Sequence, residues 1–174
     1  MPEYYNLGDH SESIEIVFDA AKISYSDLLD VFWKSHNASV RPYSTQYKSI
    51  IFYHDEEQHR MALESRDKIE AQTGRKMLTE IRPASTFFQA EDYHQKYYMQ
   101  RYPELVREMM AIYPDINDYV NSTAVARING YAGGFGTEES LQEELGNLGL
   151  SPEGMEELRE IAGKGLLSVC PVRS

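Results

Sequence analysis

Cysteine, basic residues and long apolar runs are all scarce in this chain of 174 residues. A single cysteine excludes an intramolecular disulfide framework and any metal site built from several thiolates. Only 17 Lys and Arg stand against 28 Asp and Glu, which gives a net charge of −11. This balance argues against nucleic-acid and anionic-membrane partners, because affinity for phosphates comes largely from clustered basic residues. No apolar run approaches the roughly 18 residues of a membrane-spanning helix.

A secretory signal pattern is also missing from the start of the sequence. Met1, Pro2 and Glu3 are followed by neither a basic stretch nor an apolar one. We therefore expect a cytoplasmic protein, with no metal site and no bound cofactor.

The first hundred residues alternate between patterns typical of strands and of helices. Strands are expected at 14–18, at 47–53 and at 78–81, the second with both faces covered because Ile50, Ile51 and Phe52 are continuous. Helices are expected from Ser24 or Ser26 to His36 and from Asp55 to about Gln72. In the first helix Leu29, Phe32 and Trp33 share one apolar face, so Trp33 is expected in the core. This order predicts an α/β or α+β domain with helices packed on a sheet.

The remainder of the chain has the pattern of short helices. They are expected at 103–113, 115–129, 137–145 and 151–162. Gly130–Gly134 reads as a glycine-rich helix stop. Residues 101–174 carry 6 basic and 12 acidic residues, against 11 and 16 in residues 1–100. We therefore predict a sheet-and-helix domain at 1–100 and an acidic helical extension at 101–174.

The sequence is rich in tyrosine, with 13 residues, many of them beside histidine or another tyrosine. Tyrosines often pack at the edge of a core, with the ring buried and the hydroxyl in water. Most are expected to pack in this way, and the rest could donate hydrogen bonds to a neutral ligand.

Several motifs, in order from about residue 2 to 100, resemble those of the A-type peptide methionine sulfoxide reductases. These enzymes return methionine S-sulfoxide to methionine. The motifs are Pro2-Glu3-Tyr4, Gly8-Asp9-His10-Ser11-Glu12, Ile23-Ser24-Tyr25, Phe32-Trp33, His36, Gln46-Tyr47-Lys48-Ser49-Ile50, Asp55-Glu56-Glu57-Gln58, Thr79-Glu80-Ile81 and Ala90-Glu91-Asp92-Tyr93-His94-Gln95. The resemblance implies a two-layer sandwich of sheet and helices.

The resemblance also implies which residues carry the chemistry. A thiolate attacks the sulfoxide sulfur while the oxygen receives a proton, because oxide is a very poor leaving group. The family's acid falls on Glu12, and two tyrosines that bind the oxygen fall on Tyr4 and Tyr47. Apolar and aromatic walls around Glu12 would raise the pKa of its carboxyl and suit it to act as the acid.

The family's nucleophile is a cysteine in a Gly-Cys-Phe-Trp segment, and this segment does not occur in the sequence. The family's first strand and first helix are missing with it, and Pro42 replaces an acidic residue before Gln46. Cys170 follows a glycine-containing segment, as the family's resolving cysteines do. A resolving thiol attacks the sulfenic acid of the nucleophile and forms a disulfide, which thioredoxin or another thiol reduces.

These features leave different interpretations open. The first is a form of the reductase that is truncated or starts at an alternative site, and is inactive as written. The second is a non-catalytic binding or regulatory module that retains the sulfoxide pocket or an oligomer surface. The third is an enzyme in which Cys170 is the nucleophile, which a flexible terminal position disfavours because it preorganises the thiol poorly.

Overall fold

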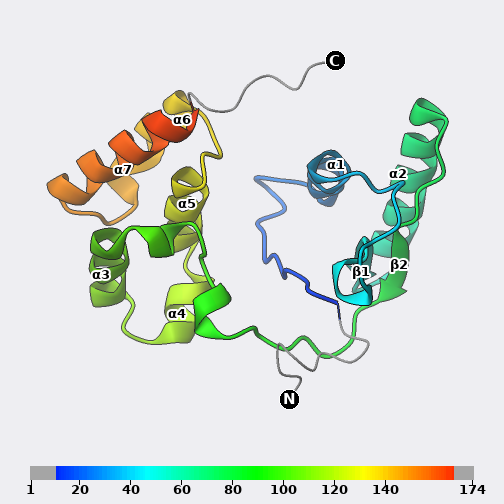
Figure 1. Ribbon diagram of the computed structural model, residues 1–174, viewed down its shortest axis with the longest axis horizontal. Helices are drawn as coiled ribbons and strands as arrows, with labels where there is room; N and C mark the ends of the chain where they lie inside the picture. Colours follow the sequence, from blue (N-terminus) through cyan, green and yellow to red (C-terminus); the bar gives the residue numbers. More distant parts are fainter. Residues whose placement is uncertain (1–10, 167–174) are drawn as a thin grey trace. The chain divides into compact units, whose positions relative to one another are not determined.

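The computed structural model describes residues 11–166. The chain divides between Gln89 and Ala90 into two compact units. Figure 1 labels their helices and strands. The first unit holds a parallel sheet and helices, and the second is helical. The chain thus combines seven α-helices with a two-stranded parallel sheet in its described part, which confirms the predicted α/β class.

Helix α1, Tyr25–Ser35, begins where the sequence predicts. The Ser24 side chain accepts a hydrogen bond from the Asp27 amide, and the Asp27 carboxylate accepts one from the Ser24 amide at 2.9 Å. This reciprocal cap satisfies backbone donors at the helix start. The hydrogen bonds from the Ser24 hydroxyl and amide lower the pKa of the Asp27 carboxyl.

A strand–helix–strand unit follows, made of β1 (Ile50–Tyr53), α2 (Glu56–Thr73) and β2 (Glu80–Pro83). Strands β1 and β2 pair in parallel, with Ile51 opposite Ile81. Gly74 ends α2 at φ 64°, a left-handed conformation that glycine adopts without a steric penalty. Both strands and the helix confirm elements predicted from the sequence.

Helices α1 and α2 pack together over the sheet and enclose a small core. The core residues are Leu29, Trp33, Ala38, Ile51, Ala62 and Met77. The Trp33 indole N–H donates to the Ser65 hydroxyl of α2 at 3.0 Å, so its polar atom is satisfied. The prediction that Trp33 belongs to the core is confirmed.

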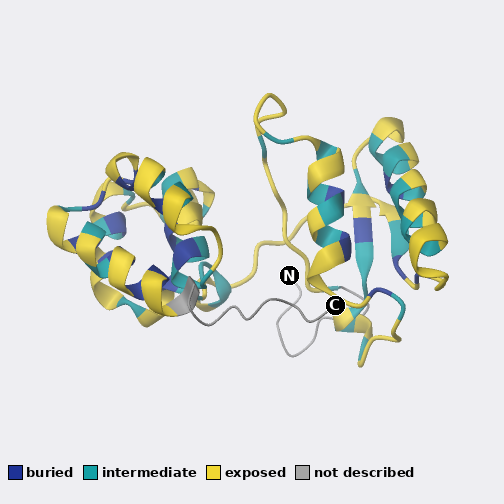
Figure 2. Cartoon of the chain, turned by 90° about the horizontal axis from the view of Figure 1, so that it is seen from above, coloured by how far each residue is buried: buried dark blue, intermediate teal, exposed yellow. Residues whose placement is uncertain are grey.

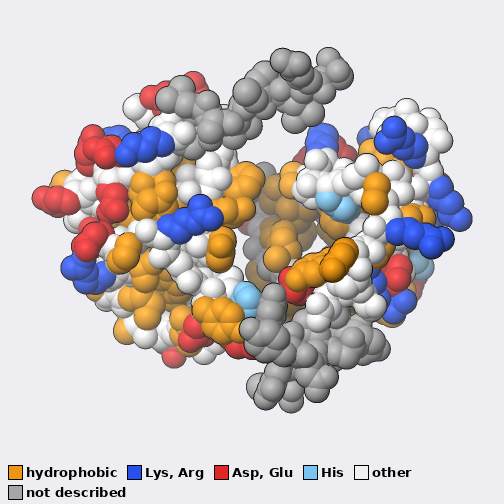
Figure 3. All heavy atoms as spheres, viewed as in Figure 1, with side chains coloured by type: hydrophobic (Ala, Val, Ile, Leu, Met, Phe, Trp, Pro, Cys, Tyr) orange, Lys and Arg blue, Asp and Glu red, His pale blue; other side chains and the backbone are white. Residues whose placement is uncertain are grey.

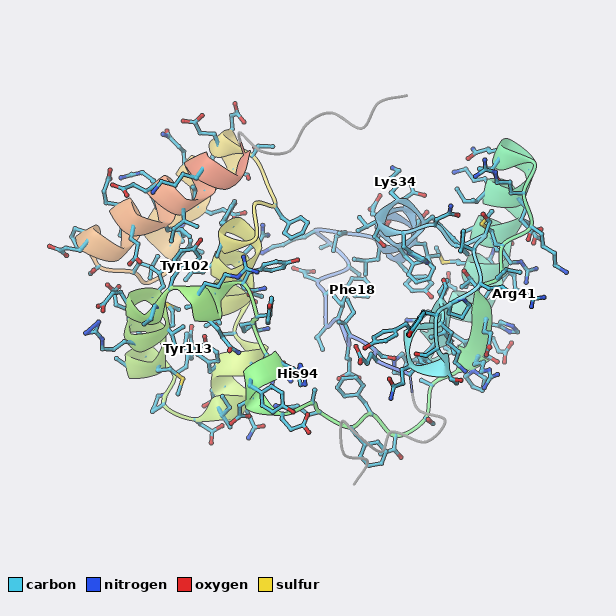
Figure 4. The ribbon with its side chains drawn as sticks, viewed as in Figure 1. Phe18, Lys34, Arg41, His94, Tyr102 and Tyr113 are labelled. Carbon is cyan, nitrogen blue, oxygen red and sulfur yellow. The ribbon has the colours of Figure 1, made fainter. Side chains whose placement is uncertain are left out.

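The strand predicted at 14–18 is wrong, because the structure has no strand there. Ile14 is 84 % exposed and Val17 is 94 % exposed, and Phe18 (Figure 4) is half-buried. Alternating apolar residues form a strand only beside a pairing partner, and the described residues offer none. Strand β1 is likewise not covered on both faces, since Ile51 is buried but Phe52 is 37 % exposed. Apolar side chains at the surface are visible in Figure 3.

The second unit is a set of short helices around its own core. Its α-helices are α3 (Pro103–Ile112), α4 (Ile116–Asn121), α5 (Thr123–Ala132), α6 (Glu138–Glu144) and α7 (Pro152–Leu166). Tyr102 and Tyr113 flank α3 (Figure 4). The largest fully buried side chains here are Met99, Leu105, Met109, Val125, Ile128, Leu145 and Leu158. Figure 2 colours the buried positions of the chain dark blue. The helical character predicted for this part is confirmed.

The helix predicted at 115–129 is two helices in the structure. Ser122 has extended backbone angles, and its side chain accepts a hydrogen bond from the Val125 amide, so it caps α5 and ends α4. Asn129 on α5 then accepts hydrogen bonds from the amides of Tyr98 and Met99. Gly133 caps the end of α5 and Gly134 has φ 80°, which confirms the glycine-rich stop.

Candidate functional site

Two of the site residues predicted from the sequence, Glu12 and Tyr47, lie in the described part of the chain. Tyr4 and Cys170 lie outside it. The site is therefore built here from the segments around Glu12 and Tyr47 and from the residues that hold them.

The segments that carry Glu12 and Tyr47 lie side by side. The Glu12 amide donates a hydrogen bond of 3.0 Å to the Gln46 carbonyl oxygen. The Ser11 hydroxyl reaches the Thr45 carbonyl at 3.4 Å. Tyr47 ends a short 3-10 helix, Thr45–Tyr47, so these contacts bring Glu12 close along the backbone to Tyr47.

The side chains at this junction are open to solvent. Glu12 is exposed and Tyr47 is 52 % exposed. The described residues alone therefore do not form the enclosed carboxyl that the resemblance implies for Glu12. Ile14, Ile16 and Val17, next along the chain, are also exposed.

A chain of side-chain hydrogen bonds lies directly after Tyr47. The His36 ring contacts the Ser49 hydroxyl through Nε2 at 2.7 Å, and Ser49 contacts the Thr79 hydroxyl at 2.7 Å. On its other side, His36 Nδ1 lies 3.1 Å from the Ser35 hydroxyl. These hydrogen bonds join the end of α1 to the residue before β1 and the residue before β2. Sequence reasoning identified His36 and Ser49 only as parts of motifs, because their contact is not local.

Charged residues next to this chain are paired with one another. Glu80 on β2 lies 3.5 Å from the Lys48 ammonium and 2.5 Å from the Arg82 guanidinium. Lys48, which follows Tyr47, therefore shares one carboxylate with Arg82.

An open cavity of about 290 Å³ adjoins His36. Its lining residues are Trp33, His36, Asn37, Ala38, Ser39, Ile69, Thr73, Arg75 and Met77. Glu12 and Tyr47 do not line it, so it is separate from the junction described above.

Residues 11–166 contain no cluster of three or more His, Cys, Asp or Glu side chains suited to hold a metal ion. No helix in the same range is long and apolar enough to cross a membrane.

Comparison with known proteins identifies the family of this sequence. The family model "Peptide methionine sulfoxide reductase" matches residues 2–135. The chain belongs to this family. The match reaches beyond residue 100, where the sequence motifs end, and into the helical unit. Part of that unit is therefore included in the family's sequence pattern.

Relatives of this reductase family occur in animals, archaea and plants. A peptide methionine sulfoxide reductase of Drosophila melanogaster is 38 % identical over 156 residues, which is 87 % of this chain and 61 % of the relative. One named MsrA from Methanothermobacter thermautotrophicus is 46 % identical over 99 residues, 52 % of this chain and 58 % of the relative. The A5 reductase of Oryza sativa is 36 % identical over 137 residues, 75 % of this chain and 53 % of the relative. The chain thus spans about three fifths of these relatives or less.

Proposed function

We propose that this chain supplies the part of a methionine S-sulfoxide reductase site that binds and protonates the sulfoxide oxygen. Glu12 is the acid, and the hydroxyls of Tyr47 and Tyr4 donate hydrogen bonds to the oxygen. The observation that carries the proposal is the contact between the Glu12 amide and the Gln46 carbonyl, which joins the acid's segment to the tyrosine's segment. The family match supports the same assignment.

The reaction requires a thiol and an acid together. The cysteine thiolate attacks the sulfoxide sulfur, Glu12 gives its proton to the oxygen, and methionine leaves as the oxygen passes to the cysteine as a sulfenic acid. The cysteine sulfur is oxidised by two electrons and the methionine sulfur is reduced by two. A second thiol then forms a disulfide with loss of water, and thioredoxin or another dithiol reduces it.

The attacking thiol does not come from a Gly-Cys-Phe-Trp segment of these 174 residues, because none is present. We assign Cys170 the resolving role, and we place the cycle in the cytoplasm, where thiols stay reduced. The 174 residues alone should therefore bind methionine S-sulfoxide without reducing it. Substrates would be oxidised methionines in proteins or free methionine sulfoxide.

A dithiothreitol-driven assay with methionine S-sulfoxide tests this proposal. The chain and its Cys170→Ser variant should both give the background rate. Appending a segment of the family that carries Gly-Cys-Phe-Trp should produce turnover, and Glu12→Gln in that longer chain should lower the rate by about 100-fold or more. Turnover by the 174 residues that Cys170→Ser removes would instead make Cys170 the nucleophile.

The missing nucleophile also favours a second candidate, a binding or regulatory module that retains the sulfoxide pocket without chemistry. It differs from the first candidate in one result. If the lengthened chain binds the sulfoxide but stays inactive with its added thiol reduced, the binding module is the better description.

A further inference from the structure

We infer that His36 is a positioning residue of this site: its ring contacts the Ser49 hydroxyl through Nε2 and so fixes Ser49 and the segment that carries Tyr47. The role of His36 in catalysis rests on the proposed function. The positioning of the Ser49 and Tyr47 segment rests on the hydrogen bonds that link Ser35, His36, Ser49 and Thr79.

The direction of each hydrogen bond in this chain follows from its first member. The Ser35 hydroxyl donates its single proton to the Phe32 carbonyl at 2.8 Å. Ser35 Oγ can therefore only accept from His36 Nδ1, which must carry the ring proton. In the neutral ring Nε2 is then an acceptor, and the Ser49 hydroxyl donates to it. Ser49 has no second proton, so Thr79 must donate to Ser49.

Packing holds the ring in the orientation that this chain requires. His36 meets the Phe32 ring edge-on, with centroids 4.7 Å apart, while Ser35 and Ser49 hold its two nitrogens. At the far end Thr79 is only 7 % exposed. Leaving a buried hydroxyl without its acceptor costs free energy, so these hydrogen bonds resist breaking or changing direction.

The anchored Ser49 restricts Tyr47 because the short segment between them has little freedom. Ser49 is held through its side chain and through its carbonyl, which accepts from the Glu80 amide at 3.0 Å. At the other end of the segment, the Gln46 carbonyl accepts from the Glu12 amide. Tyr47 lies between these two fixed points, so losing the Ser49 anchor should free its backbone on one side.

The first measurement is the tautomer of His36 by ¹⁵N NMR on the full chain at a pH where the ring is neutral. We expect Nδ1 to carry the proton and Nε2 to be bare, which is the tautomer that free histidine disfavours. Ser49→Ala should shift the ring toward the Nε2–H form, and the His59 ring, which stacks on Tyr53 away from this chain, should not change. An Nε2–H tautomer in the unmodified chain would overturn the inference.

The second measurement follows the Tyr47 ring resonances in variants. His36→Leu and Ser49→Ala should move them, whereas His36→Gln should restore them because its amide oxygen can accept from Ser49. Ser65→Ala is the matched control, since it removes one side-chain hydrogen bond from the same unit at Trp33. Unchanged Tyr47 resonances in folded His36→Leu would refute the positioning role.

A third measurement separates this inference from the proposed function. We use N-acetylmethionine S-sulfoxide as the probe and expect His36→Leu to weaken its binding about tenfold, with His36→Gln within a factor of about three of the unmodified chain. If the unmodified chain fails to bind the probe, the proposed function is wrong, while the tautomer and the Tyr47 resonances still decide the role of His36. Equal binding by the unmodified chain and His36→Leu would contradict the positioning role of His36 without contradicting the proposed function.

Discussion

The Glu12 amide donates a 3.0 Å hydrogen bond to the carbonyl oxygen of Gln46, the residue before Tyr47. This contact joins two segments far apart in the sequence, and it is the structural basis for treating Glu12 and Tyr47 as parts of one site. Because it is a contact between backbone atoms, it holds the segment that carries Glu12 against the segment that carries Tyr47.

Removing the Ser65 hydroxyl should destabilise the first unit. Ser65→Ala leaves the buried Trp33 indole N–H without its acceptor, which should cost about 1–3 kcal/mol of unfolding free energy. Urea unfolding followed by fluorescence measures it, since Trp33 is the single tryptophan of the chain. Ser65→Thr keeps a hydroxyl and is the control. A loss below about 0.3 kcal/mol in Ser65→Ala would show that water satisfies the indole.

Removing the Tyr25 hydroxyl should not lower the free energy of unfolding, in contrast to removing the Ser65 hydroxyl. This hydroxyl is buried and has no hydrogen-bond partner among residues 11–166, and burial together with the Asp55 charge raises the pKa of Tyr25. Tyr25→Phe removes an unsatisfied polar group and keeps the ring, so we expect stability to be unchanged or to rise by up to about 1 kcal/mol. The same urea experiment measures this, and a loss of more than about 1 kcal/mol would reveal an unrecognised partner.

The sequence predicts the features that depend on neighbouring residues. It misses the features that depend on residues far away along the chain. The starts and ends of α1 and α2 depend on local residues such as Ser24 and Gly74, so they were predictable. The strand at 14–18 was mispredicted because pairing needs a distant neighbour that local alternation does not report. The hydrogen-bond chain from His36 to Thr79 joins three separate segments, so no spacing rule indicated it. Glu12 and Tyr47 were identified by family resemblance rather than by pattern.

In the second unit, Glu108 should hold the start of α7. Its carboxylate accepts hydrogen bonds from the Ser151 amide at 2.8 Å and the Ser151 hydroxyl at 2.7 Å. Glu108→Ala leaves a partly buried amide unpaired, so we expect a loss of about 1–3 kcal/mol by thermal or urea unfolding followed by circular dichroism. Glu104→Ala on the same helix removes only an exposed pair with Arg107 and should cost less than about 1 kcal/mol. Equal losses in the two variants would contradict this role.

Alkaline pH should destabilise the same unit through Tyr119. Burial raises the pKa of Tyr119 above the ordinary value of 10.0, and its hydroxyl donates to the Met99 sulfur. The folded state therefore holds this proton more tightly than the unfolded state does. The resulting stability is complete below pH 10 and is lost as the pH rises through the folded pKa.

Urea unfolding of the unmodified chain and of Tyr119→Phe, at neutral pH and near pH 11, tests this dependence. Phenylalanine cannot ionise, so the variant should lose less stability between the two conditions. Identical pH dependence in both chains would show that Tyr119 makes no such contribution.

The central claim is that Glu12 and Tyr47 form one site for the sulfoxide oxygen. The most direct test is an NMR titration of the 174-residue chain with N-acetylmethionine S-sulfoxide, with the R epimer as the matched control. We expect saturable shifts at both Glu12 and Tyr47, larger for the S epimer, with loss of binding in Tyr47→Phe. Absence of shifts at these two residues, or equal shifts with both epimers, would contradict the claim.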